Sequence, residues 1–151
     1  MTYSGHPASC AAGLATMDVL QNTSILESSA NELAPYFAKA LGSLADHPVV
    51  GQVRAKGLVA AVELVKDKGS RERLAPESGG AVYTRDRAIE NGLMVRQTGD
   101  AMIMSPPFVT STEEVDALLS KLTSALDRTA AFYNVKSVSY THLTLPTTGY
   151  V

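Results

Sequence analysis

The sequence predicts an α+β domain in which a four-stranded, mainly antiparallel sheet is covered by helices. Apolar residues recur at helical spacing in four segments and at strand spacing in four others, in the order α-α-β-β-α-β-β-α. The 151 residues, of which 45% are hydrophobic and 19% charged, have the size and balance of one globular domain.

Two helices are expected before the first strand. Residues 8–20 follow a proline suited to the first helical position and are apolar almost all round, which predicts a buried helix. A free domain has nothing to cover such a helix, so the pattern also hints that preceding chain is missing. The second helix begins at the capping residues Asn22 to Ser24, keeps one apolar face as far as Leu44, and is kinked by Pro35.

Two strands follow, on either side of Gly57. Residues 49–56 alternate between apolar and polar side chains, which predicts a half-exposed strand. Residues 58–65 are apolar on both faces until Glu63, which predicts a central strand. The charged residues 66–80, with glycine and proline among them, are expected to form an exposed loop.

The second half of the chain predicts a helix, a hairpin and a long helix. The first helix covers residues 81–90, and the hairpin strands cover residues 93–97 and 101–105. Leu122 and its apolar neighbours at helical spacing mark the inner face of the last helix. Two capping boxes could begin that helix, Thr110 with Glu113 or Ser111 with Glu114.

The last residues have neither helical period nor caps. Residues 138–147 resemble the conceptual translation of a transposon-end sequencing adapter, a known contaminant of assembled reading frames. We therefore expect residues 137–151 to be a non-native tail that carries no function; a genuine edge strand is the alternative.

Charge and cysteine content exclude several classes of function. The net charge of −2 gives no electrostatic basis for binding nucleic acid or an anionic membrane. No apolar run is long enough to cross a bilayer, and the first residues do not form a signal peptide. A single cysteine cannot form an internal disulfide, so a reducing, cytoplasmic compartment is expected.

Two places could bind an anion on the evidence of the residues alone. Thr2 and Ser4 precede a helix start whose free backbone N–H groups could hold a phosphate, although from spacing alone an ordinary helix cap is the commoner explanation. Arg96 lies in the predicted middle of a strand beside apolar residues. It either faces solvent or receives a planar anion such as a carboxylate.

Other chemistry-bearing residues are expected to be structural. His6 and Cys10 are one helical turn apart but have no third metal ligand at useful spacing, so Cys10 is expected in the core. The three methionines of the predicted hairpin, Met94, Met102 and Met104, are expected in the core as well.

Three stretches together resemble the C-terminal part of class III aminotransferases. They are residues 2–7 (TYSGHP), residues 53–58 with 61–64 (VRAKGL, AVEL), and residues 92–100 with 105–107 (GLMVRQTGD, SPP). The resemblance covers residues 2–132 and fits best the branch that acts on amines or ω-amino acids with pyruvate. Members of the family are pyridoxal-phosphate enzymes of fold type I. The resemblance therefore implies that the chain contains their small C-terminal domain over residues 23–136, after an interdomain segment and buried helix over residues 1–22.

The resemblance also implies roles for four residues. Thr2 matches the threonine that hydrogen-bonds the cofactor phosphate of the partner subunit, and Tyr3 and Ser4 line the same loop. Arg96 matches the mobile arginine that receives the substrate carboxylate and swings aside for apolar amines. The intact protein would be a cytoplasmic homodimer that moves an amino group from an amine or amino acid to a 2-oxo acid, expected to be pyruvate.

The chain departs from the family in one respect that affects activity. The family's Schiff-base lysine lies upstream of the threonine loop, and no lysine here matches it, so no catalytic residue is assigned and the chain itself is expected to be inactive. A free-standing, non-enzymatic small-molecule-binding domain is the alternative. Another branch of the family remains open too, such as ornithine, 4-aminobutyrate or acetylornithine aminotransferase or glutamate-semialdehyde aminomutase, although the Arg96 segment disfavours it.

Overall fold

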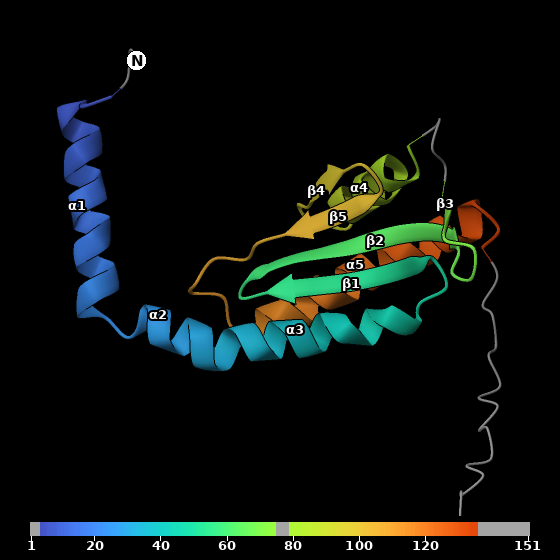
Figure 1. The fold of residues 1–151 in the computed structure, drawn as a ribbon, viewed down its shortest axis with the longest axis horizontal. Coiled ribbons are helices and arrows are strands. Elements are labelled where there is room, and N and C mark those ends of the chain that lie inside the picture. The colour runs from blue at the N-terminus through green and yellow to red at the C-terminus, as the bar shows by residue number, and fades with distance from the viewer. Residues whose placement is uncertain (1–3, 75–78, 136–151) are drawn as a thin grey trace, which may run out of the picture.

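A computed structural model describes residues 4–74 and 79–135 of the chain. The helices and strands follow one another in the predicted order, and there is one further short strand (Figure 1). The helical elements are α1 (Pro7–Asn22), α2 (Ile25–Ser28), a π-helical turn (Ser29–Leu33), α3 (Ala34–Gly42), a 3₁₀ turn (Ser43–Asp46), α4 (Gly80–Glu90) and α5 (Thr112–Phe132). The strands are β1 (Val50–Lys56), β2 (Val59–Asp67), β3 (Glu72–Arg73), β4 (Arg96–Thr98) and β5 (Ala101–Met104).

The strands form one antiparallel sheet in the order β1-β2-β5-β4. The expected α+β fold is therefore confirmed, and so is the central position predicted for residues 58–65, because β2 pairs with both β1 and β5. The predicted exposed loop contains a strand that the sequence did not indicate: β3 pairs with the end of β2.

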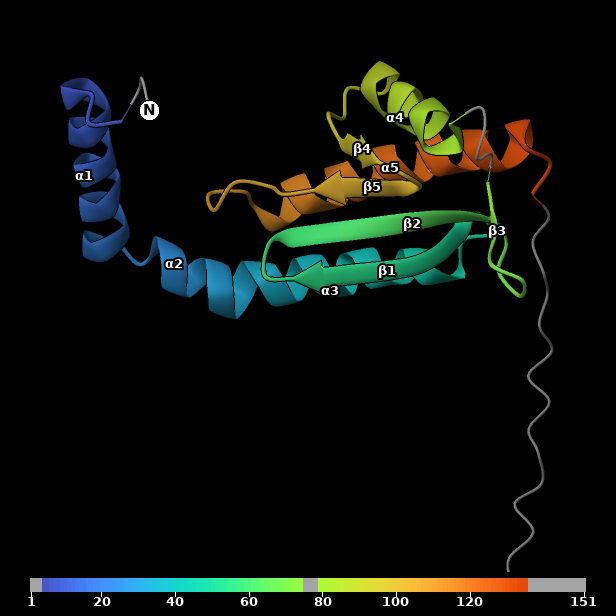
Figure 2. The ribbon, with the colours of Figure 1, turned by 45° about the horizontal axis from the view of Figure 1, so that its top comes forward.

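One face of the sheet and three helices enclose the core. In both ribbon views α3 and α5 run along the same side of the sheet, while α4 lies near β4 and β5 (Figure 2). Val62 and Met102 point into the core from neighbouring strands, and Phe37 and Leu122 meet them from α3 and α5. All four side chains are fully buried, so their removal from water is a main source of stability.

The second predicted helix is interrupted where the sequence indicates. The π-helical turn Ser29–Leu33 immediately precedes α3, whose first turn holds Pro35. Proline has no N–H to donate and crowds the preceding turn, so the regular hydrogen-bond ladder is broken at this place. The predicted kink is thus present as a change of helix type.

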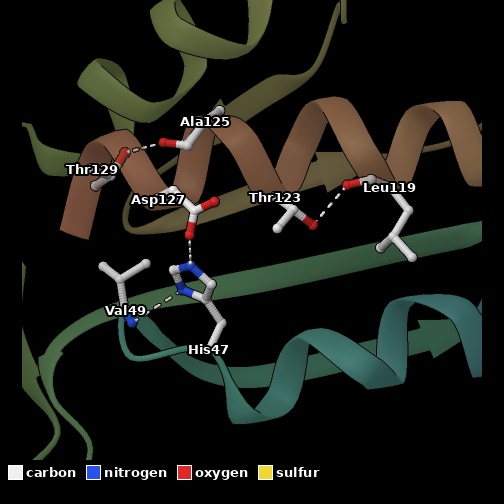
Figure 3. Close-up of polar contacts among 7 residues, drawn as sticks. All are labelled: His47, Val49, Leu119, Thr123, Ala125, Asp127 and Thr129. Atoms are coloured by element: carbon white, nitrogen blue, oxygen red, sulfur yellow. Dashed lines mark hydrogen bonds and ion pairs between the residues drawn. The ribbon is translucent and has the colours of Figure 1, made fainter. Parts of the chain in front are cut away.

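The turn between α3 and β1 is tied to α5 through a histidine (Figure 3). The Nε2 atom of His47 lies 3.1 Å from Oδ1 of Asp127, and the N–H of Val49 donates to Nδ1 over 3.4 Å. Because Nδ1 is the acceptor, the neutral ring carries its proton on Nε2 and donates it to Asp127. This contact fixes where β1 enters the sheet.

Helix α1 stands away from the rest of the fold and contains no buried residue (Figure 1). The described part of the chain does not cover this helix, and its burial in a longer protein stays a prediction. Cys10, expected in the core, is exposed. Leu14, Met17 and Val19 are all more than half exposed. An apolar helix tends to be buried, but its sequence does not show whether the same chain provides the surface that covers it.

Three local expectations change in the second half. The strand predicted over residues 93–97 begins only at Arg96, and Met94, expected in the core, is 90% exposed; Met102 and Met104 are buried as expected. Of the two possible capping boxes, α5 uses Ser111 with Glu114.

The expected tail over residues 137–151 lies outside the described residues. None of the described helices is both long and apolar enough to cross a membrane.

Candidate active site

A groove of about 1030 Å³ lies beside β4. The β4–β5 hairpin and the segment after it form one wall, and α4 and α5 contribute the other. Its lining is mainly apolar, with Val95, Met104, Pro107 and Leu118 among the contributors. An apolar groove with a few polar groups is the usual form of a small-molecule site.

Arg96 is a cation of this groove that has no partner among residues 4–74 and 79–135. Arg85 is engaged by the Asp86 carboxylate through two contacts of 2.7 and 2.9 Å, and Lys121 Nζ donates to the carbonyl oxygen of Gly92 over 3.2 Å. The Arg96 side chain makes no hydrogen bond or ion pair with any other described residue, and the residue is exposed. Its guanidinium is therefore available to an anion.

The sheet register places Arg96 on the outer face. Arg96 pairs with Ile103, whose neighbour on β2 is Ala61. Successive residues of a strand point to opposite faces, and the next residues along, Met102 and Val62, are the buried ones. Arg96 is the first residue of β4 instead of the middle of a strand, because Gly92 adopts a left-handed conformation (φ 74°) and residues 93–95 approach the sheet without pairing.

Four features hold the turn between β4 and β5. Gly99 has a positive φ of 57°, and Gln97 Nε2 donates to the Gly99 carbonyl over 2.6 Å. The backbone oxygen of Asp100 accepts a hydrogen bond of 2.8 Å from Leu64 N–H on β2. The Asp100 carboxylate accepts from Nε of Arg73 on β3, and this hydrogen bond, assisted by the opposite charge, raises the pKa of the arginine. The turn that follows Arg96 is thus fixed on two sides.

Sequence reasoning missed the contribution of Arg73. It lies 27 residues from its partner Asp100, in a segment predicted to be an exposed loop. No local pattern could reveal the pair, because it depends on the pairing of β3 with Val65 of β2.

The predicted phosphate loop is only partly within the described residues. Thr2 and Tyr3 lie outside them, whereas Ser4 is exposed at a turn before α1. Gly5 has a φ of 78°, the N-cap residue His6 makes no side-chain cap bond, and the first turn of α1 contains no acidic residue. A first turn with no acidic side chain and no cap from the His6 side chain is compatible with a phosphate.

The structure does not bring the two predicted anion sites together. The start of α1 is remote from the β4–β5 hairpin in both views (Figure 2). Among residues 4–74 and 79–135, no group of three histidine, cysteine, aspartate or glutamate residues could hold a metal ion, so His6 and Cys10 form no such site.

Comparison with known proteins agrees with these features. The aminotransferase class-III family model matches residues 1–126. A putrescine–pyruvate aminotransferase of Pseudomonas aeruginosa is 44% identical over 130 residues, which are 86% of this chain and 28% of that protein. The chloroplastic gamma aminobutyrate transaminase 3 of tomato (Solanum lycopersicum) is 38% identical over 128 residues, 85% of this chain and 24% of that protein.

Solved structures give the same result. The ω-transaminase of Pseudomonas jessenii in complex with PMP superposes with a TM-score of 0.82 at 33% identity, covering 89% of this chain and 29% of that one. A thermostable sixfold mutant of the same enzyme gives 0.82 and 33%, over 88% of this chain and 29% of that one. The chain thus spans about a quarter to three tenths of the length of these relatives.

Proposed function

The chain belongs to the class III aminotransferases, which depend on pyridoxal phosphate, and we propose that it acts as the C-terminal part of a transaminase. The intact protein would move an amino group from an amine or amino acid to a 2-oxo acid, with pyruvate as the acceptor. The observation that carries this proposal is Arg96, an unpartnered guanidinium at the rim of an apolar groove, within the segment that matches the family. The likeness to a putrescine–pyruvate aminotransferase supports pyruvate as the acceptor.

Arg96 binds the carboxylate of the oxo acid in this proposal. A guanidinium presents parallel N–H donors that fit both oxygens of a carboxylate, and such charge-assisted pairs are stronger than neutral hydrogen bonds. Apolar neighbours such as Val95 and Pro107 exclude water from part of the groove and thereby strengthen the attraction. Because no internal partner holds the side chain, it can also turn away when the substrate has no carboxylate.

The residues before α1 would hold the cofactor phosphate. Bound pyridoxal phosphate supplies the electron sink that amino-group transfer needs. Thr2, Tyr3 and Ser4 would provide hydrogen-bond donors, and the uncapped first turn of α1 favours a negative charge. The start of α1 is remote from the β4–β5 hairpin, and this supports a homodimer in which each subunit lends its loop to the partner's site. The single cysteine supports a reducing cytoplasm as the compartment.

We further propose that the 151 residues alone do not catalyse transamination. The described lysines that make contacts are engaged in structural ones: Lys66 with Glu72, Lys68 with the Ala45 carbonyl, and Lys121 with the Gly92 carbonyl. Lys39 and Lys56 lie on α3 and at the end of β1, outside the groove. Lys121 is the one described lysine that lines the groove with Arg96, and its contact with the Gly92 carbonyl supports a structural role for it.

A chimeric enzyme tests the proposed function. The matching segment of this chain replaces the 130 residues to which it is similar in the Pseudomonas aeruginosa enzyme. With pyridoxal phosphate, putrescine and pyruvate, we expect the chimera to form alanine and the 151-residue chain to form none. A folded, dimeric chimera that binds the cofactor but forms no alanine would contradict the proposal. The same assay with 4-aminobutyrate tests the other donor that the similar proteins suggest.

A further inference from the structure

We propose that Arg73 and Asp100 are positioning residues that hold the β4–β5 hairpin, and with it Arg96, against β3. The proposal rests on the proposed function, in which Arg96 receives the substrate carboxylate. Neither residue needs to touch the substrate; both act through the backbone that carries Arg96.

Contacts beyond strand pairing hold Arg73 and its neighbours in place. Arg73 pairs with Val65 of β2, and Leu74, the next residue, is buried in the core against Gly80. Lys66 Nζ contacts the carboxylate of Glu72 over 2.8 Å and supports the same strand. The backbone of Arg73 is therefore fixed independently of the hairpin.

Asp100 is held both by its side chain and by its backbone. Its carboxylate accepts a hydrogen bond from Arg73, and its side chain is only 18% exposed, so solvent screens this pair less than most surface pairs. Its backbone oxygen accepts from Leu64 N–H. The residue at the turn is thus tied both to β2 and, through Arg73, to β3.

The turn is connected to Arg96 through β4. β4 has only three residues, and it contacts the rest of the sheet solely through β5. A strand that short makes few ladder bonds, so its position depends strongly on the turn that connects it. Releasing Asp100 would let the hairpin fray from its turn towards Arg96.

The pair has a second consequence, which provides the discriminating test. Arg73 neutralises the acidic residue of the hairpin, so a charge-only model predicts opposite effects of removing the two partners. Loss of Arg73 would weaken anion binding at Arg96, whereas loss of the Asp100 charge would strengthen it. Positioning predicts that both losses weaken binding.

The experiment uses the full chain with ¹⁵N-labelled arginine side chains, titrated with pyruvate at constant ionic strength. The readout is the Nε–Hε signal of Arg96. We expect Arg73→Gln and Asp100→Asn each to weaken pyruvate binding about three- to fivefold, as an exposed ion pair allows. The double variant should be no weaker than either single variant, because the two residues act as one contact.

Arg71→Gln is the matched control. Arg71 lies two positions from Arg73, is exposed, and makes no ion pair or hydrogen bond within the described part of the chain. Its replacement removes the same charge without touching the tether, so pyruvate binding should stay near the wild-type value. Opposite effects of Arg73→Gln and Asp100→Asn, or an effect no larger than that of Arg71→Gln, would overturn the proposal.

Hydrogen exchange separates this proposal from the proposed function. We expect the amides of residues 96–103 to exchange severalfold faster in Arg73→Gln and Asp100→Asn, and those of β1 to remain unchanged. If the wild-type Arg96 signal does not respond to pyruvate, the carboxylate role of Arg96 fails, while accelerated exchange would still support the tether. If pyruvate binds but exchange is unchanged in both variants, only the tether is rejected.

Discussion

The substitutions Thr84→Val and Thr129→Val, made singly and together, test how α4 packs on α5 behind the groove. Both threonine side chains are fully buried, and their Oγ1 atoms lie 2.9 Å apart. Thr84 Oγ1 also lies 3.1 Å from the carbonyl oxygen of Gly80, and Thr129 Oγ1 donates to the Ala125 carbonyl over 2.7 Å (Figure 3).

The magnitude follows from counting hydrogens. Two hydroxyl hydrogens serve three contacts, so either threonine keeps a carbonyl partner after the other is replaced. Each single change therefore removes about one net hydrogen bond without leaving a buried donor unsatisfied, and should lower the free energy of unfolding by about 1 kcal/mol. The double variant should lose less than the sum of about 2 kcal/mol, because the shared contact is counted once.

Urea unfolding of the full chain measures these values. The six tyrosines, with no tryptophan, provide the fluorescence signal, and circular dichroism provides a second probe. Strictly additive losses would refute the shared network. A loss above about 3 kcal/mol in either single variant would also refute it, since it would indicate an orphaned buried group.

Three further predictions concern stability. Ser111→Ala removes the capping box at the start of α5 and should lower the unfolding free energy by about 1 kcal/mol, seen as a lower melting temperature; an unchanged temperature would reject the cap. Phe37→Ala empties a fully buried site and should cost about 3–5 kcal/mol in urea unfolding, whereas Val109→Ala, at a 76% exposed position, should stay within about 0.5 kcal/mol; equal losses would contradict the assigned core. The pKa of Asp67 is lowered because its carboxylate accepts hydrogen bonds from the backbone and side chain of Ser70. The stability that Asp67 contributes is therefore present above its unfolded-state pKa and is lost as the pH falls through its folded-state pKa. The stability difference between wild type and Asp67→Asn should therefore shrink on acidification, and a difference constant with pH would contradict this.

Local patterns were sufficient for most of the fold. Residues 58–65, which are apolar on both faces, predicted the central strand β2. Pro35 predicted the interruption of the second helix. Strand β3 could not be predicted, because two residues have no period and their pairing depends on Val65 of β2. The apolar residues of α1 do not reveal which surface would cover the helix, and the described part of the chain supplies none.

In the candidate site too, some residues could be predicted from local sequence patterns and others could not. Arg96 stood out because a guanidinium beside apolar residues is unusual, and the structure places it at the groove without a partner among the described residues. Its place at the start of β4 was not predicted, because residues 93–95 have the apolar character of a strand but do not pair in the sheet. The role of Arg73 could not be predicted, because it depends on a contact with Asp100, which lies 27 residues further along the chain.

The role of Arg96 is tested most directly by Arg96→Leu in the chimeric enzyme. Loss of a bidentate charge-assisted pair, worth about 1.5–3 kcal/mol, predicts that the KM for pyruvate rises by about ten- to a hundredfold. The KM for putrescine, which has no carboxylate, should stay unchanged, and so should both constants in the control Arg71→Leu. An unchanged KM for pyruvate, or an equal rise for both substrates, would contradict the assignment of Arg96 as the carboxylate-binding residue.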